Sequence, residues 1–112
     1  SLVDAAVREA REETGRPFVP AAVVGLYLWH GAVDRPAYLR IAFCGEAGER
    51  TPGATLDPEI VGCHWLSRED LLARRADLRS PLVLRCVDDY LAGHRHPLSL
   101  LASFAAAAPL AP

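Results

Sequence analysis

The sequence predicts one domain of the α/β class, in its α+β form, with helices packed against a β-sheet. Three observations support this prediction: an amphipathic helix over residues 1–14, two segments rich in β-branched and aromatic residues over 23–30 and 37–46, and two short helices closer to the end. The 112 residues are 51% hydrophobic and 23% charged, which suits one globular core and leaves no room for a second domain.

The first helix is predicted from its composition and from the residues at its two ends. Residues 1–14 are rich in Ala, Glu and Arg, which favour helix. Ser1 is suited to the N-cap, and Gly15 stands where a glycine commonly closes a helix. Pro17 and Pro20 then prevent the helix from continuing.

A hairpin is predicted next. The segments 23–30 and 37–46 have strand composition, and turn-forming residues over 31–36 join them. A polar loop containing Gly and Pro follows over 47–58, and a third short strand is expected over 60–66. These three segments are the strands that we expect within the chain.

Two helices complete the predicted domain. Ser67 is suited to the N-cap of a short helix over residues 67–75, because acidic residues follow it in the first turn. Pro81 suits the first turn of a last helix over residues 81–92, and Gly93 is its expected stop. The order of elements is therefore helix, hairpin, short strand and two helices.

Charge and composition exclude several functional classes. The net charge of −2 argues against a nucleic-acid-binding surface, and the sequence shows neither an apolar run of membrane-spanning length nor a signal peptide. The cysteines (Cys44, Cys63 and Cys86) are odd in number and lack CxxC spacing, so we expect reduced thiols in a cytoplasmic protein. All 12 basic residues are Arg and Ala is frequent, which indicates a GC-rich, bacterial genome.

Three glutamates near the end of the first helix form the most informative pattern. Glu9, Glu12 and Glu13 stand at i, i+3 and i+4, so their carboxylates share one face. A solvated surface helix is the ordinary explanation for such residues. However, like charges at this spacing repel each other, and acidic residues near the C-terminal end oppose the helix dipole. A bound divalent cation would remove both costs, and hard oxygen ligands suit Mg²⁺.

The same helix resembles the second part of the Nudix box, Arg-Glu-U-x-Glu-Glu-x-Gly-U, where U is a bulky aliphatic residue. The fixed positions of the box are occupied by Arg8, Glu9, Glu12, Glu13 and Gly15. Ala10 and Arg16 stand at the two U positions and depart from the pattern. The resemblance implies a Nudix-type mixed β-sheet sandwiched between helices. The first Gly and first Glu of the box would precede Ser1, so we expect the N-terminal strands of that fold to be missing.

A second group of residues resembles the bacterial phosphatase NudJ subgroup of the Nudix hydrolase superfamily. It comprises the segment 78–83, Tyr90, Gly93, Arg95, the pair 97–98, the strand end at Trp29, the pair 39–40 and Cys63-x-Trp65. The resemblance makes residues 1–101 a partial Nudix hydrolase domain and 102–112 an Ala/Pro-rich tail. It implies a Mg²⁺-dependent phosphohydrolase that releases orthophosphate from nucleoside di- and triphosphates and from hydroxymethylpyrimidine diphosphate, a thiamine precursor.

The resemblance also implies roles for individual residues of the helix. Glu12 and Glu13 would bind Mg²⁺, with Mn²⁺ as an alternative ion. Glu9 would be a further metal ligand or would orient the attacking water. Arg8 would hold a glutamate in place by an ion pair. In this scheme the metal neutralises charge on the diphosphate and lowers the pKa of a bound water, and a carboxylate accepts the proton.

Further candidates lie outside the helix. Many Nudix enzymes add a carboxylate ligand from a loop, and Glu59, with Asp57 as second choice, is placed for this role. An exposed acidic loop explains Glu59 equally well. Arg40, Trp29 and Tyr27 lie on the expected strands, where Arg can pair with phosphate and an aromatic ring can stack on a base. Each of these three is more often a core or surface residue.

The sequence leaves several functions open. The partner is a small nucleotide or diphosphate substrate, and oxidised nucleoside triphosphates, ADP-ribose or capped RNA are alternatives that the box does not separate. A Nudix-like binding module without catalysis is a second class, although the visible glutamates of the box are intact. A partial domain with weak metal binding and activity is a third. The protein is expected to be a monomer or a homodimer.

Overall fold

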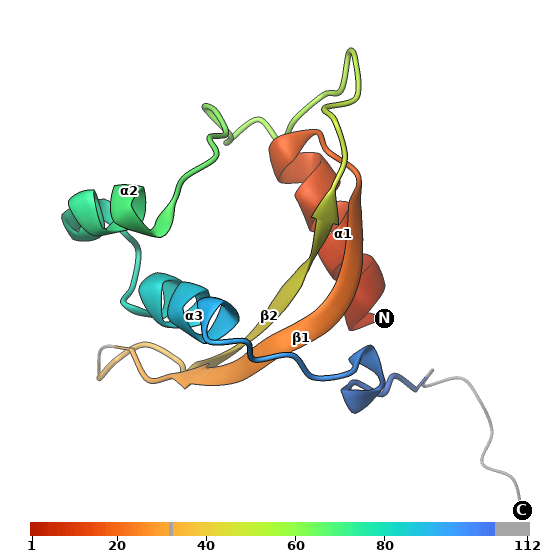
Figure 1. Cartoon of the computed structure of the whole chain (residues 1–112). Coiled ribbons are helices and arrows are strands. Elements are labelled where there is room, and N and C mark those ends of the chain that lie inside the picture. Colours follow the sequence, from red (N-terminus) through yellow and green to blue (C-terminus); the bar gives the residue numbers. More distant parts are fainter. Residues whose placement is uncertain (32, 105–112) are drawn as a thin grey trace, which may run out of the picture.

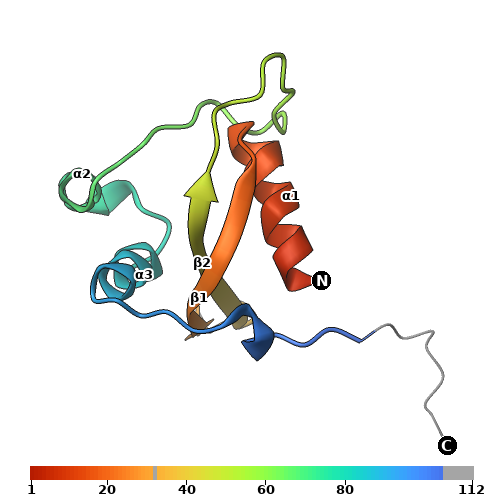
Figure 2. The ribbon, with the colours of Figure 1, turned by 45° about the vertical axis from the view of Figure 1, so that its right-hand side comes forward.

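The computed structural model describes residues 1–31 and 33–104. Helix α1 (Leu2–Thr14) leads into strands β1 (Phe18–Trp29) and β2 (Tyr38–Ala47), and helices α2 (Arg68–Ala73) and α3 (Leu82–Leu91) follow. Short 3₁₀ helices η1 (Arg75–Asp77) and η2 (Leu98–Leu100) lie before and after α3. Figure 1 shows the arrangement of these elements, and in Figure 2 the strands lie between α3 and α1; both helices pack against β1. The predicted fold class, a sheet between helices, is confirmed.

Helix α1 begins and ends where the sequence predicts. The backbone amide of Asp4 donates to Ser1 Oγ at 3.1 Å, which satisfies one of the amides that the first turn leaves without a partner. At the other end Gly15 adopts the left-handed conformation with φ of 71°, and its amide donates to the Arg11 carbonyl. A glycine enters this conformation without the steric cost that a side chain brings.

The predicted hairpin is present as an antiparallel ribbon. Trp29 lies opposite Tyr38 next to the turn, and Phe18 lies opposite Ala47 at the far end. β1 begins earlier than the predicted residue 23, although the added stretch contains Pro20. The register shifts directly after Pro20, which is consistent with the rule that proline enters strands at irregular positions.

The predicted third strand over residues 60–66 is wrong. This segment has no regular structure, and the sheet formed by the described residues contains only β1 and β2. Val61 is 104% exposed and Trp65 is 74% exposed. A strand needs a partner for its backbone groups, and this segment instead contacts the end of α1, where the Cys63 thiol donates to a carbonyl.

The two C-terminal helices follow their sequence signals. Ser67 and Asp70 form a capping box at the start of α2, in which each side chain accepts from the backbone amide of the other. Pro81 directly precedes the first residue of α3, and Gly93, with φ of 91°, follows its end. No helix in the described part of the chain is both long and apolar enough to cross a membrane.

The core lies where α3 and η2 meet the middle of β1. Val23 is fully buried, with Ala22, Val24 and Tyr27 almost so. The amides of Val23 and His96 each donate to the other's carbonyl at 2.8 Å, so the segment before η2 is joined to β1. The predicted tail over 102–112 stays a prediction, because residues 105–112 lie outside the described residues.

Candidate active site

Two of the predicted catalytic glutamates face a large cavity. Glu9 and Glu13 lie one turn apart on α1 and line a cavity of about 720 Å³. Residues of β2, of the segment 63–65 and of α3 form its other walls. Much of the cavity wall is apolar, and the two carboxylates lie on one side of it.

The third glutamate lies outside this cavity wall. Glu12 is more than half exposed, and its Oε1 atom lies 3.7 Å from Arg8 Nε across one turn of α1. An exposed pair of this kind adds little stability, about 0.3–0.5 kcal/mol at this spacing. It does place Arg8 beside one glutamate of the helix. The catalytic and metal-binding roles of both residues stay predictions.

The carboxylates of α1 are suitable in kind for a divalent cation. Their oxygens are hard donors of the sort that Mg²⁺ and Mn²⁺ prefer. Among residues 1–31 and 33–104, however, no group of three or more His, Cys, Asp or Glu side chains is close enough together to hold a metal ion. Binding would therefore require Glu9, Glu12 and Glu13 to change rotamer, which exposed glutamates do readily.

The loop after β2 is fastened to the C-terminal end of α1. The amide of Asp57 donates to the Glu12 carbonyl at 2.8 Å, and the amide of Thr51 donates to the Gly15 carbonyl at 2.9 Å. The Cys63 thiol donates to the Glu13 carbonyl at 2.6 Å. These contacts satisfy carbonyls that the last turn of a helix leaves without intrahelical partners.

The two candidate carboxylates of the loop differ in their contacts. The Asp57 side chain accepts from the amide of Glu59 at 3.0 Å, so it stabilises the local turn. Glu59 itself is exposed. The loop therefore runs beside the end of α1, and the assignment of Glu59 as a metal ligand stays a prediction.

The cavity also collects the thiols. Cys44, Cys63 and Cys86 all line it, from β2, the loop and α3, and all three are free. Burial raises the pKa of the Cys86 thiol, which favours its neutral form. The sequence gives no sign that these distant cysteines share one cavity.

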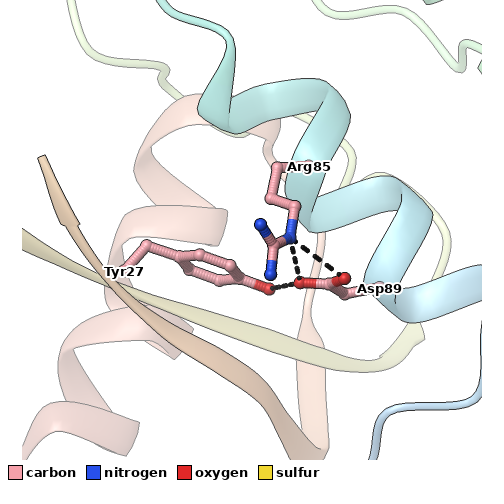
Figure 3. A network of polar contacts seen from close by, with 3 residues as sticks. All are labelled: Tyr27, Arg85 and Asp89. Atoms are coloured by element: carbon pink, nitrogen blue, oxygen red, sulfur yellow. Dashed lines mark hydrogen bonds and ion pairs between the residues drawn. The ribbon is translucent and has the colours of Figure 1, made fainter.

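None of the three predicted substrate contacts is part of the cavity wall. Tyr27, Trp29 and Arg40 do not line it, and Tyr27 is only 8% exposed. Figure 3 shows the Tyr27 hydroxyl directed at Asp89 of α3, to which it donates at 2.6 Å. Burial and this hydrogen bond raise the pKa of Tyr27. The structure thus gives Tyr27 a packing role between β1 and α3, and substrate contact by all three stays a prediction.

Sequence reasoning missed two residues of the cavity wall as functional candidates. The Arg16 guanidinium lies over the Trp65 ring, 5.3 Å from its centroid, and both residues line the cavity. The signal for Arg16 was present in the sequence, because a charged residue stands where the Nudix box has an aliphatic one. Trp65 belongs to the Cys63-x-Trp65 pattern, whose position beside α1 only the fold reveals.

Comparison with known proteins gives the family. The NUDIX domain model matches residues 1–86. Phosphatase NudJ of Escherichia coli strain K12 is 36% identical over 104 residues, which cover 93% of this chain and 67% of that protein, and the Shigella sonnei Ss046 protein of the same name gives the same values. A solved NUDIX hydrolase from Nitrosomonas europaea is 39% identical with a TM-score of 0.87, over 93% of this chain and 70% of that one. The chain therefore belongs to the Nudix hydrolase family.

Proposed function

We propose that this Nudix hydrolase cleaves diphosphate linkages with the help of Mg²⁺ and releases orthophosphate from nucleoside di- and triphosphates. Hydroxymethylpyrimidine diphosphate is a further proposed substrate, and Mn²⁺ is the alternative ion. One observation carries the proposal: Glu9 and Glu13 stand together on the wall of a cavity of about 720 Å³. Sites for small molecules of nucleotide size commonly have volumes of about 300–1,000 Å³.

The relatives support the phosphatase activity. Both curated relatives described above carry the name Phosphatase NudJ, and the similarity extends along 93% of this chain. The fixed residues of the box that fall within the chain are all present. These findings favour catalysis over a binding module, since a degenerate box that lacks glutamates would be expected of a module without catalysis.

The residues of the chain have distinct tasks in the proposed reaction. A bound Mg²⁺ supplies neutralisation of the phosphate charge and a more acidic water. Glu12 and Glu13 would hold such a cation through their carboxylate oxygens. Glu9 accepts the proton of the attacking water, and Arg8 holds the Glu12 carboxylate from 3.7 Å away.

The proposed setting is the cytoplasm of a bacterium. This proposal follows from the sequence, whose three cysteines are odd in number and lack CxxC spacing. The proposed partner is a small nucleotide or diphosphate, and the protein acts as a monomer or homodimer. The net charge of −2 does not favour nucleic acid as a substrate.

Phosphate release from a panel of nucleotides and diphosphates tests the proposal. With Mg²⁺ present, we expect Glu13→Gln to lower the rate about a hundredfold or more, because a neutral amide binds a divalent cation poorly. Glu69→Gln is the matched control: Glu69 is an exposed glutamate of α2 outside the cavity, so the rate should change less than about twofold.

Metal binding gives a second readout that does not depend on turnover. Titration with Mn²⁺, followed by electron paramagnetic resonance, should show weaker binding in Glu13→Gln than in Glu69→Gln. Equal rates and equal Mn²⁺ affinities for the two variants would contradict the assignment of the α1 carboxylates. A chain that binds Mn²⁺ through Glu13 yet hydrolyses no diphosphate would favour the binding module instead.

A further inference from the structure

The charged residues at the C-terminal end of α1 form a second feature of the cavity. Arg16 and Arg50 line the same cavity as Glu9 and Glu13. We propose that these two arginines bind the diphosphate group of the substrate, and that Trp65 positions the Arg16 guanidinium for this contact. The inference rests on the proposed function for the identity of its substrate, although the anion site itself is independently testable.

The Arg16 side chain is oriented by contacts on two sides. Its Nη1 atom donates to the Gly48 carbonyl at 2.9 Å, and its guanidinium lies over Trp65 at 5.3 Å. A guanidinium carries five N–H donors, so one bond to a carbonyl leaves most of them available. Stacking on an aromatic face occupies the π surface and not the edge that carries these donors. The edge therefore remains suited to a bidentate contact with phosphate.

The backbone at Arg16 is fixed as well. The Arg16 amide donates to Thr14 Oγ1 at 3.1 Å, and the Thr14 hydroxyl donates in turn to the Ala10 carbonyl at 2.5 Å. The side chain therefore leaves α1 from a defined point immediately after Gly15. Pre-organisation of this kind lowers the entropy lost when a ligand binds.

The charge of Arg16 has no acidic partner in the described part of the chain. Residues 1–31 and 33–104 contain ion pairs for other arginines and none for Arg16, which is half-buried. Arg50 extends over Gly15, since a Cβ placed there would lie 3.3 Å from Arg50 Nε. Two guanidinium groups thus share one cavity with two glutamates. A diphosphate bound with a divalent cation suits this arrangement, because the guanidinium groups can bind the anionic oxygens and the glutamates can bind the cation.

Helix capping is the competing explanation for these arginines. Cations near the C-terminal end of a helix stabilise it by about 0.3–1 kcal/mol through the helix dipole. That effect requires neither the stacking on Trp65 nor a position on the cavity wall. It also predicts a change in folding stability without a change in anion affinity, so the two explanations are separable.

Calorimetric titration with inorganic pyrophosphate in metal-free buffer tests the inference. We expect Arg16→Gln to raise the Kd for pyrophosphate about tenfold, the loss typical of a hydrogen bond between charged groups. Arg74→Gln is the matched control, because Arg74 is an exposed arginine at the C-terminal end of α2 and does not line the cavity. Its Kd should change less than about twofold.

Trp65 is tested as a positioning residue by substitution and rescue. Trp65→Leu removes the ring beneath the guanidinium and should raise the Kd for pyrophosphate about threefold, whereas Trp65→Phe keeps a ring and should restore most of the affinity. Arg50 lies in an exposed loop, and Arg50→Gln should also weaken pyrophosphate binding. If circular dichroism shows that Arg16→Gln is unfolded, the affinity of Arg50→Gln tests the anion site instead.

The outcomes separate this inference from the proposed function. Unchanged pyrophosphate affinity in Arg16→Gln and Arg50→Gln would overturn the inference, even if wild-type protein releases phosphate with Mg²⁺. An equal loss in Arg74→Gln would overturn it too, because pyrophosphate would then bind to arginines in general and not to this cavity. Loss of pyrophosphate binding in Arg16→Gln, combined with no hydrolysis by wild type, would support the anion site and refute the proposed activity.

Discussion

The contact between Tyr27 and Asp89 should make a measurable contribution to stability. Tyr27→Phe removes one hydroxyl and leaves the ring in place between β1 and α3. The hydroxyl donates to Asp89 Oδ2 at 2.6 Å, and Arg85 Nε lies 3.0 Å from the same oxygen (Figure 3). The substitution therefore removes one donor from a carboxylate that keeps another.

The expected loss follows from the type of hydrogen bond. Bonds to a charged group contribute about 1.5–3 kcal/mol. Because Arg85 still donates to Asp89 in the variant, the lower end of this energy range applies. We therefore expect the free energy of unfolding to fall by about 1.5 kcal/mol at pH 7. For a chain of this length that loss corresponds to a decrease in Tm of about 6 °C.

The pH dependence gives a second check on the same contact. The hydrogen bond from Tyr27 and the charge of Arg85 lower the pKa of Asp89 below its usual value of 3.8. The stabilisation is complete above that value and is lost as the pH falls through the lower pKa of the folded state. The difference between wild type and Tyr27→Phe should therefore narrow below pH 3.8.

Urea denaturation at pH 7 and at successively lower pH measures both effects. Tyr38→Phe is the control, since Tyr38 is exposed and its hydroxyl makes no hydrogen bond within the described residues. Its free energy of unfolding should change by less than about 0.5 kcal/mol. The reasoning would be refuted if Tyr27→Phe were as stable as wild type at pH 7, or if Tyr38→Phe lost as much.

Two further predictions concern the ends of helices. Gly15→Ala places a side chain at φ of 71° and a Cβ 3.3 Å from Leu56 Cδ2. Thermal denaturation should therefore show that the free energy of unfolding falls by about 1–2 kcal/mol, and an unchanged Tm would contradict this backbone strain. Ser67→Ala removes the capping box of α2 and should lower the free energy of unfolding by about 1 kcal/mol. Ser67→Asp should recover most of this loss. Equal stability of Ser67→Ala and wild type would show that the cap is not needed.

The parts of the fold that the sequence predicted correctly are those governed by local chemistry. Ser1 and Gly15 determine the ends of α1 through contacts within a few residues of each other. Ser67 does the same for α2 through the capping box. Such contacts depend on neighbours in sequence, so a pattern of residues is sufficient to predict them.

The errors concern contacts between distant segments. Residues 60–66 have strand composition, yet a strand also requires a partner, and the pairing of β2 is with β1. The strand position of Tyr27 was correct, but its burial depends on Asp89, which lies 62 residues away. The i, i+3, i+4 spacing correctly predicted that the glutamates lie near one another. It could not predict that Glu9 and Glu13 line the cavity and Glu12 does not, because the cavity is also formed by the loop and α3.

The attachment of the loop to α1 determines where this protein tolerates changes in length. Asp57 and Cys63 are each bonded to a carbonyl in the last turn of α1, so the chain between them has a fixed span. An insertion there would break one of these two hydrogen bonds to α1. The turn at Gly53 differs, because it is exposed and a Cβ at that position would meet nothing within 4 Å. We therefore expect the turn at Gly53 to tolerate an inserted segment. The stretch from Asp57 to Cys63 should not tolerate a change in its number of residues.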